Sequence, residues 1–177
     1  REEPFAYIDL TKSNSQLKEE ISSGHAKCIQ KAIGHGLTFC EVSDLRYLKV
    51  FYKFYKDMLG RKNIVPQRFS YFTNLFSYLK TNLQLVSVSC DGFVVAVSIV
   101  LNSGLSSFML YGGMNEAGYE KYAKYFMIYQ LIFKYKQAGY KRLVLGTGHA
   151  GKDSIYWFKR NFSDVGDDYL YTYEYVF

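Results

Sequence analysis

The sequence predicts a domain of the α/β (α+β) class, in which helices flank a mixed, mostly antiparallel sheet. Three consecutive strand patterns between residues 83 and 111 predict an antiparallel meander, and helical patterns lie on both sides of it along the chain. Amphipathic helices and half-buried strands must cover one another, so this order favours a layer of helices on a sheet. At 177 residues the chain is long enough to form one domain with a full core.

The meander is the clearest local signal. Leu83–Cys90 and Phe93–Leu101 are rich in apolar and β-branched residues, and they are separated by Asp91-Gly92, which favours the type I′ turn of a two-residue hairpin. Ser103-Gly104 predicts a second turn into a strand over Leu105–Tyr111. We therefore expect three antiparallel strands in succession.

A glycine pair follows the third strand. We expect Gly112 and Gly113 to stop this strand, and paired glycines here indicate either a bulge or a close approach of the backbone to a ligand.

A long helix is predicted next, over Glu116–Ala138. Asn115 is a favourable N-cap and Gly139 a favourable glycine after the C-terminus. Aromatic and apolar residues recur with helical spacing and predict the face that lies on the sheet: Tyr122, Tyr125, Phe126, Tyr129, Ile132 and Phe133. Other apolar residues point elsewhere and indicate a second neighbour: Met127, Ile128 and Leu131.

The rest of the C-terminal part alternates strand and helix. Lys141–Leu145 is too short for anything but a buried strand, and Gly146-Thr147-Gly148 ends it. Ser154–Phe162 is then helical, and alternating tyrosines over Tyr169–Phe177 predict a final strand.

The N-terminal part reads as strand, helix, strand and two helices. Ala6–Leu10 is a strand, Ser13–Gln30 a helix with Ser13 as cap and buried Leu17 and Ile21, and Leu37–Val42 a strand. Ser43 or Asp44 would cap the next helix. The two helices that follow carry apolar stripes: Leu45, Leu48, Tyr52, Tyr55 and Leu59 in the first, and Phe69, Phe72, Phe76 and Leu79 in the second.

Composition limits the class of protein. No run of apolar residues reaches the length of a membrane span, which predicts a soluble chain. Three cysteines, Cys28, Cys40 and Cys90, lack metal-ligand spacing and indicate reduced thiols in a cytoplasmic protein without a metal site. The net charge of +6 suits an anionic substrate without requiring one. The chain begins at Arg1, so it is expected to be part of a longer protein.

Two lysines four residues apart mark a basic helix face. Lys27 and Lys31 repel each other at this spacing unless they are solvated or face an anion. Two readings stay open: an ordinary solvated face, or a site for the phosphates of a nucleotide-linked or lipid-linked acceptor.

These segments together carry a family resemblance. The strand meander, long helix, short strand and last helix resemble the second half of the GNAT acyltransferase fold. Lys27-Cys-Ile-Gln-Lys31-Ala-Ile-Gly-His-Gly36-Leu37 resembles the basic Lys-Ala-x-x-x-Gly segment of the Fem-type peptidoglycan bridge-forming aminoacyltransferases. Ile155-Tyr-Trp-Phe158-Lys159-Arg-Asn-Phe162 resembles that family's aliphatic-x-x-Phe-Lys-x-x-Phe motif. The resemblance runs from Ala6 to Phe177.

The resemblance implies a domain organisation and a reaction. Fem-type proteins carry two GNAT-like domains, so residues 1–177 are expected to be a single GNAT-like domain, the C-terminal part of a two-domain protein. The implied reaction forms an amide on the amine of a cell-envelope precursor, nucleotide-linked or lipid-linked, in the cytoplasm or at the inner face of the membrane. The expected donor is aminoacyl-tRNA or acyl-CoA. Met114-Asn115-Glu116-Ala117-Gly118-Tyr119 stands where acyl-CoA enzymes of the fold have a glycine-rich phosphate loop, and its carboxylate would repel a diphosphate.

Candidate site residues follow from the motif and its surroundings. The resemblance implies that the Lys159 ammonium meets the anionic acceptor or the charge that develops on the transferred carbonyl; the alternative is an ordinary surface lysine. His149 is a candidate base because its usual pKa lies near neutrality. The expected substrate-contacting residues are Tyr111, Gly112, Gly113, Lys27, Lys31, Gly146, Thr147, Gly148 and Trp157. Asp153 either caps the last helix or takes part in the chemistry.

Two rival functions remain open. One is a non-catalytic GNAT-like module that binds an acceptor or a partner. The other is a CoA-dependent N-acyltransferase of sugar or polysaccharide metabolism.

Overall fold

The computed structural model describes residues 2–147, 153–163 and 168–171. Within them, the strands form one seven-stranded sheet in the order β2-β3-β4-β5-β6-β1-β7. Neighbouring strands are antiparallel except β5 and β6, which are parallel. This confirms the mixed, mostly antiparallel sheet. The strands are β1 Glu2–Asp9, β2 Thr38–Val42, β3 Leu83–Cys90, β4 Phe93–Ser103, β5 Ser106–Met114, β6 Arg142–Thr147 and β7 Asp168–Tyr171.

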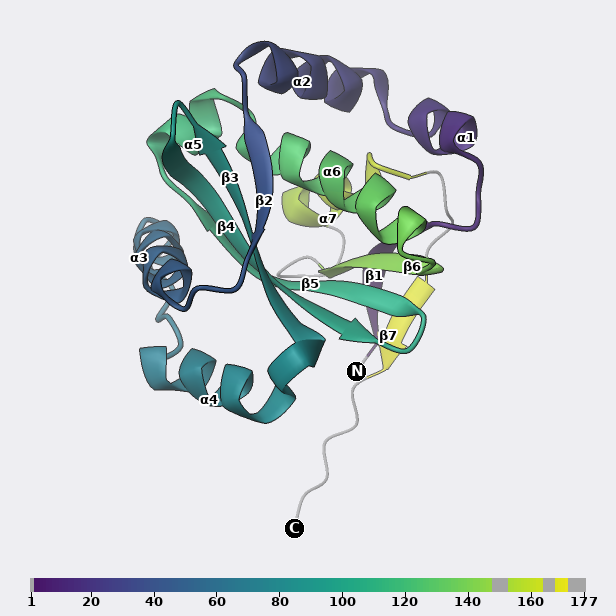
Figure 1. Ribbon diagram of the computed structural model, residues 1–177. Coiled ribbons are helices and arrows are strands. Elements are labelled where there is room, and N and C mark those ends of the chain that lie inside the picture. Colours follow the sequence, from purple (N-terminus) through teal and green to yellow (C-terminus); the bar gives the residue numbers. More distant parts are fainter. Residues whose placement is uncertain (1, 148–152, 164–167, 172–177) are drawn as a thin grey trace.

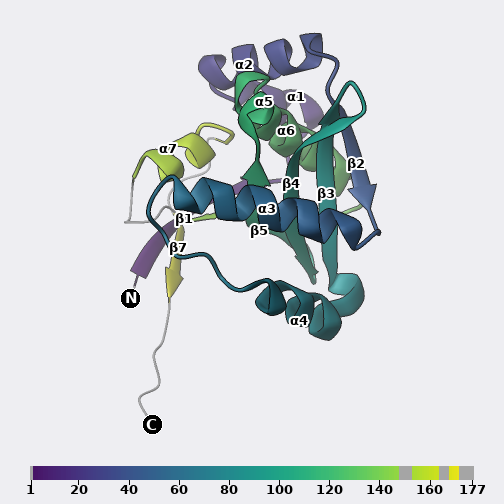
Figure 2. The same cartoon turned by 90° about the vertical axis from the view of Figure 1, so that its left-hand side faces the viewer.

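Helices cover both faces of the sheet. Figure 1 shows α1, α2 and α6 on one side and α3 and α4 on the other, and Figure 2 shows α3 crossing in front of the strands. Each side has its own apolar core. The helices are α1 Asn14–Glu19, α2 Ser23–Gly34, α3 Arg46–Gly60, α4 Phe69–Leu79, α5 Glu116–Glu120, α6 Ala123–Gln137 and α7 Ser154–Arg160, and a 3₁₀ turn follows α4 at Lys80–Asn82.

The predicted meander is confirmed. β3, β4 and β5 pair in succession, and the turn residues Asp91 and Gly92 have φ angles of 50° and 80°, as a type I′ turn requires.

The glycine pair does not end a strand, so that prediction is wrong. β5 continues to Met114, and Gly112 and Gly113 pair with Ser98 and Val97 of β4. The pairing of β4 and β5 does shift in register, but before the glycines: Ile99 pairs with Tyr111 and Val100 with Met109, so Leu110 is an extra residue in β5. The glycines instead allow close packing. A Cβ atom on Gly113 would lie 2.6 Å from the Tyr55 backbone nitrogen, so α3 rests directly on the strand.

The predicted helix over Glu116–Ala138 is two helices. Asn115 caps α5 as expected, accepting a hydrogen bond from the Gly118 amide at 2.9 Å. Tyr122 then adopts a left-handed conformation, with φ 59° and ψ 32°, which interrupts the helix before Ala123. α6 therefore takes its own direction across the sheet, and Gly139, with φ 86°, follows its C-terminus.

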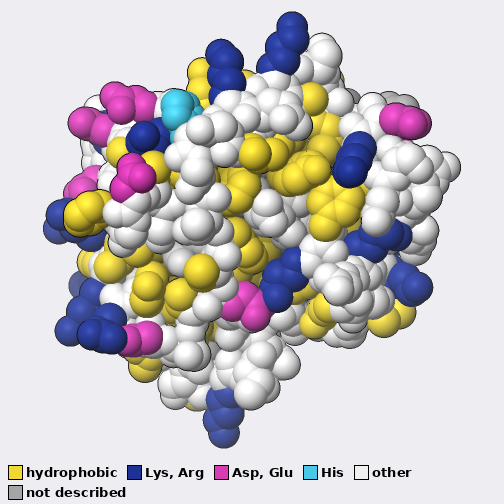
Figure 3. Space-filling view, turned by 45° about the horizontal axis from the view of Figure 1, so that its top comes forward, with side chains coloured by type: hydrophobic (Ala, Val, Ile, Leu, Met, Phe, Trp, Pro, Cys, Tyr) yellow, Lys and Arg dark blue, Asp and Glu magenta, His cyan; other side chains and the backbone are white. Residues whose placement is uncertain are grey.

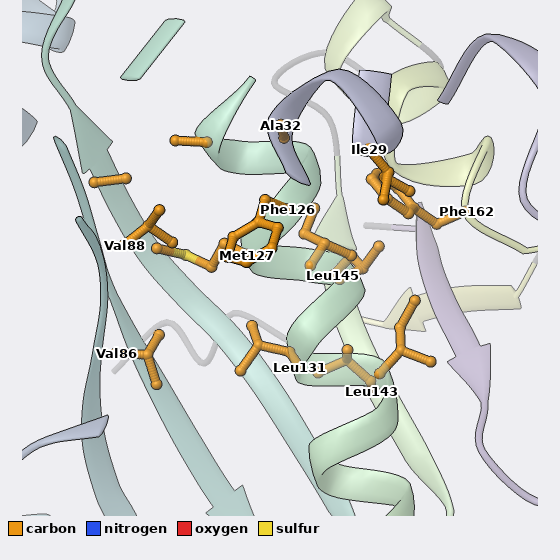
Figure 4. Close-up of a cluster of buried hydrophobic side chains, with 14 of the residues drawn as sticks. Ile29, Ala32, Val86, Val88, Phe126, Met127, Leu131, Leu143, Leu145 and Phe162 are labelled. Carbon is orange, nitrogen blue, oxygen red and sulfur yellow. The ribbon is translucent and has the colours of Figure 1, made fainter. Parts of the chain in front are cut away.

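The buried face of α6 agrees with the prediction only in part, because Phe126 and Ile132 are buried as predicted but are joined by other residues. Met127 and Leu131, expected to point elsewhere, are fully buried and point toward Val86 and Val88 of β3 (Figure 4). The tyrosines are half-buried on the side of α2, where Tyr125 packs against the ring of His25. Compact aliphatic side chains fill the sheet side, whereas tyrosines keep their hydroxyls near water.

The predicted helix over Ser13–Gln30 is also divided, into α1 and α2. Ser13 caps α1 as expected, and Ser22 caps α2 by accepting a hydrogen bond from the His25 amide. Leu17 and Ile21 are buried, as predicted.

α3 and α4 form the second core with some changes. Leu48, Tyr55 and Leu59 are buried as predicted, but Leu45 is exposed and precedes α3. Asp44 does not cap the helix as its N-cap residue; its carboxylate accepts the Arg46 amide. The aromatic rings of Phe51 and Phe54 complete the core instead. In α4, Phe72 is buried and the other predicted residues are half-buried: Phe69, Phe76 and Leu79.

The C-terminal elements differ from the prediction at their ends. β6 runs through Gly146 and Thr147 rather than stopping before them, although Gly146 has φ 84°. α7 stops at Arg160. The final strand β7 covers Asp168–Tyr171, and residues 172–177 of the predicted strand lie outside the described residues.

Among the helices that the structure describes, none is both long enough and apolar enough to cross a membrane.

Candidate active site

A cleft opens where β5 and β6 separate. The two strands pair only at Ser106–Phe108 and Arg142–Val144, and beyond these residues they diverge. The opening has a volume of about 500 Å³ and takes its walls from both helical layers. It is lined by Tyr55, Met58, Leu59, Lys62, Ile64, Val65, Gln67, Met109, Leu110, Tyr111, Gly112, Lys124, Ile128, Leu145, Ile155, Phe158 and Lys159.

Lys159 reaches into this cleft from α7. Its Nζ atom donates a hydrogen bond to the Thr147 carbonyl oxygen at 2.6 Å, next to Gly146. Gly146 has no side chain, and a Cβ atom there would lie 3.5 Å from this amine. Burial lowers the pKa of Lys159 to about 8, although the Asp153 carboxylate favours the charged form. A lysine ammonium has three N–H donors, so two remain for a substrate.

Asp153 holds the start of α7. Its carboxylate oxygen accepts hydrogen bonds from the Ile155 and Tyr156 amides, at 3.0 and 2.9 Å, so it is the N-cap of this helix. The cap fixes the helix that carries Lys159.

A second lysine in the cleft was not predicted. Lys124 lies in the first turn of α6, and its Nζ atom is 3.0 Å from the position where Gly112 would carry a Cβ atom. Burial, followed by the charge of Lys159, lowers the pKa of Lys124 to about 8. The one available signal was a lysine placed between Ala123 and Tyr125, inside an otherwise apolar helix turn.

The cleft is basic. Its described lining includes Lys62, Lys124 and Lys159 and no Asp or Glu. The remaining walls are mainly aliphatic and aromatic. Such a lining suits a ligand with an apolar body and oxygen-rich or anionic groups.

A smaller cavity of about 70 Å³, called the inner chamber below, shares the lining residues Gly112 and Lys124 with the cleft. Its other lining residues are Met58, Ala96, Ser98, Gly113, Met114 and Met127. The Ser98 hydroxyl is buried there, and it has no hydrogen-bond partner among the residues that the structure describes.

Tyr111 lines the outer part of the cleft. Its hydroxyl shares a hydrogen bond of 3.1 Å with the Tyr71 hydroxyl, and its ring packs edge-on against Tyr55 and Phe72. Burial, with this hydrogen bond and the neighbouring tyrosines, raises the pKa of Tyr111. Tyr111 therefore stays a neutral donor and acceptor across the physiological pH range.

The structure brings some of the predicted residues together. Tyr111, Gly112 and Lys159 line the cleft, and Gly146 and Thr147 lie beside the Lys159 amine. Gly113 is at the inner chamber, against α3. Gly148 and His149 lie outside the described residues.

The predicted basic pair does not belong to this group. Lys27 and Lys31 are exposed on α2 and do not line the cleft. The Lys31 amine lies over the Tyr122 ring, 5.4 Å from its centre, an arrangement that stabilises the charge locally. On the face that Figure 3 shows, lysine and arginine side chains are spread out rather than gathered into one patch.

Trp157 is also separate from the cleft. Its side chain is 52% exposed and lines a different, shallow depression next to Glu19, Glu20 and Arg160. It follows Tyr156, which is buried, so consecutive aromatic residues of α7 point to opposite sides.

Among the described residues, no cluster of His, Cys, Asp and Glu has the arrangement of a metal site. Cys28, Cys40 and Cys90 are free thiols.

His25 anchors α7 to α2. Its Nε2 atom donates a hydrogen bond of 2.9 Å to the Phe158 carbonyl oxygen, directly before Lys159. The imidazole is buried among Tyr125, Phe158 and Phe162. Burial lowers the pKa of His25, and the hydrogen bond to the carbonyl opposes this in part.

This buried imidazole predicts a pH-dependent stability. In the unfolded chain His25 titrates near its usual pKa of about 6.5, so below that pH the unfolded state binds more protons than the folded state. We expect the free energy of unfolding, measured by urea denaturation, to fall as the pH is lowered from 7 to 5. The decrease should be smaller in His25→Gln. An equally steep decrease in this variant would show that His25 is not the source of the pH dependence.

A protein-family model identifies the family to which this chain belongs. Residues 24–160 match the acetyltransferase (GNAT) domain. The chain belongs to the GNAT acetyltransferase domain family. No significant match is found among curated protein sequences.

Solved structures share this GNAT fold at low sequence identity. FemX matches with a TM-score of 0.80 and 15% identity, over 94% of this chain and 59% of FemX. The C-terminal domain of a putative lysylphosphatidylglycerol synthetase from Agrobacterium fabrum matches with a TM-score of 0.66 and 16% identity, over 96% of this chain and 60% of that structure. An aminoglycoside acetyltransferase from an uncultured soil metagenomic sample matches with a TM-score of 0.61 and 12% identity, over 82% of this chain and 99% of that structure.

The chain therefore spans about 60% of the length of the first two structures. The expected GNAT fold is confirmed, and the fold shared with FemX covers 94% of this chain.

The first turn of α5 does not suit the diphosphate of a CoA donor. The Gly118 amide is already used by the Asn115 side chain, and Glu116 places a carboxylate in the first turn. Both features oppose the binding of an anion at this helix end.

Proposed function

We propose that this GNAT domain transfers an acyl or aminoacyl group to the amine of a cell-envelope precursor, forming an amide. The observation that carries the proposal is the Lys159 amine inside the cleft between β5 and β6. The fold shared with FemX supports the aminoacyl version of the reaction. In this proposal the domain is the C-terminal one of two, in agreement with the share of FemX that it spans.

The reaction requires nucleophilic attack by the acceptor amine and departure of the donor's leaving group. The neutral acceptor amine attacks the donor carbonyl carbon, and the electron pair of the C=O bond moves to the oxygen. The C–N bond forms, the bond to the donor's leaving group breaks, and the proton lost by the amine balances the charge of that leaving group. In this proposal the Lys159 ammonium stabilises the oxyanion by a charge-assisted hydrogen bond, and its position in the cleft supports this role.

The donor in this proposal is aminoacyl-tRNA or an acyl-CoA, and the first turn of α5 favours aminoacyl-tRNA because it does not suit a diphosphate. The acceptor is a nucleotide-linked or lipid-linked precursor at the inner face of the membrane. The putative lysylphosphatidylglycerol synthetase, whose name refers to a lipid product, has the same fold and supports an acceptor of this class.

An assay of the 177-residue chain with each donor tests this function. We expect mass spectrometry to detect an amide product from aminoacyl-tRNA and a UDP-linked muropeptide, and the muropeptide to raise the melting temperature. Saturable stabilisation and turnover with acyl-CoA and an amino sugar would establish the alternative CoA-dependent reaction. Stabilisation by the muropeptide without product from any donor would establish a binding module.

A further inference from the structure

The Lys124 amine is a second cation in the cleft, and the proposed transfer reaction does not use it. Lys159 donates a hydrogen bond to Thr147, whereas no hydrogen bond or ion pair joins Lys124 to another residue of the described chain. Keeping an ammonium group half-buried without a partner costs free energy. The position therefore indicates a ligand that supplies the missing partner.

The Ser98 hydroxyl points to the same place. It is buried at the inner chamber and is also without a hydrogen-bond partner among the described residues. The Ser98 oxygen and the Lys124 nitrogen lie 2.7 and 3.0 Å from the position that a Gly112 side chain would occupy. The two groups thus lie close together against the Gly112 backbone, where any larger residue would clash with them.

The positive charges of Lys124 and Lys159 favour an anionic ligand group. Lys124 lies close enough to Lys159 for their like charges to interact. The described cleft lining includes no carboxylate, and the Asp153 carboxylate acts on Lys159 from outside this lining. A ligand ammonium would be repelled there, whereas an anion would interact favourably with both lysines.

The size of the inner chamber limits which anionic group can fit. Its volume of about 70 Å³ is roughly that of two water molecules in the liquid, which leaves room for a group of about three heavy atoms. A carboxylate has this size, and a tetrahedral phosphate is larger. Met58 and Met127 supply apolar walls for the adjoining carbon chain.

We propose that Lys124 and Ser98 form a binding site for a carboxylate of the substrate, in the small chamber beside the cleft. Lys124 and Ser98 donate to the carboxylate oxygens, and the nearby charge of Lys159 favours an anion there while its own N–H groups stay available for the transfer reaction. The inference rests on the proposed function in taking this ligand to be a substrate of acyl transfer. The site itself is tested by binding alone, without turnover.

Calorimetry at pH 7 with a matched pair of probes tests the site. Hexanoate and hexanamide have the same carbon chain and differ in the charge of their end group. We expect the full chain to bind hexanoate at least tenfold more tightly than hexanamide. Lys124→Met should abolish this preference, and Ser98→Ala should reduce it about threefold. Lys56→Met, which removes an exposed lysine outside the cleft, should leave it unchanged.

The results separate the possibilities. Equal binding of the two probes by the wild type, or an unchanged preference in Lys124→Met, would overturn the proposal. Inorganic phosphate that displaces hexanoate at lower concentration than acetate would assign the site to phosphate instead. Because the melting temperature reports folding, a folded Ser98→Ala variant with full preference also counts against the site. A chain that binds hexanoate but transfers nothing would overturn only the proposed function.

Discussion

Lys159→Ala is expected to lower the rate of acyl transfer by about 10²–10³-fold, the usual effect of removing one donor to a developing oxyanion. The melting temperature should stay the same or rise, because the variant removes an amine that is costly to bury. Single-turnover rates and a thermal melt of the same preparations measure the two effects. Lys56→Ala, an exposed lysine of α3, is the matched control.

The pH profile distinguishes two roles of this lysine. If the ammonium stabilises the oxyanion, the ratio of wild-type to Lys159→Ala rates should fall as the pH rises through about 8, the pKa of Lys159. The ratio cancels the ionisation of the acceptor amine, and the Asp153 carboxylate is common to both proteins. Removing the charge of Lys159 raises the pKa of Lys124, so in the variant Lys124 stays charged to a higher pH than in the wild type. A ratio that rises through the same range would identify a general base instead. Transfer within twofold of the wild type would show that Lys159 has no catalytic role.

Gly113→Ala is expected to lower the free energy of unfolding by about 3 kcal/mol, at the upper end of the usual cost of overpacking. An added Cβ atom would lie 2.6 Å from the Tyr55 nitrogen and 2.9 Å from the Phe54 carbonyl carbon. These are backbone atoms of α3, so no side-chain rotation relieves the contact. For a chain of this size the melting temperature should fall by about 6–12 °C, which calorimetry measures directly.

A second glycine provides the comparison for this effect. Gly24, in the first turn of α2, has no atom within 4 Å of an added Cβ atom. Gly24→Ala should therefore stabilise the protein by about 0.5–1 kcal/mol through helix propensity alone. If the two substitutions shift the melting temperature in the same direction, the close contact between α3 and β5 is not the cause.

Local chemistry made much of the fold predictable. Asp91-Gly92 fixes a hairpin by its turn conformation, and the caps Ser13 and Asn115 mark helix starts, so these elements agree with the sequence. Lys159 could be proposed because it belongs to a short motif in a recognisable order of elements. Its place in the cleft agrees with that motif.

Tertiary packing decided what the sequence alone could not show. The left-handed conformation of Tyr122 has no local signature, since tyrosine does not favour it, and it divides the helix that periodicity made continuous. The glycine pair was interpreted as a strand end because the sequence around it does not show that α3 packs directly against Gly113. Lys124 was missed because its neighbours in space, Gly112 and Ser98, are distant in sequence and approach it only in the folded sheet.

The parallel seam between β5 and β6 is only three residue pairs long. A substrate that enters beyond it separates no hydrogen-bonded strands, because those parts of the two strands are already apart. The opening is thus preorganised, and the loss of conformational entropy on association falls mainly on the incoming molecule. Rigid substrates should consequently gain more affinity here than flexible ones that offer the same chemical groups.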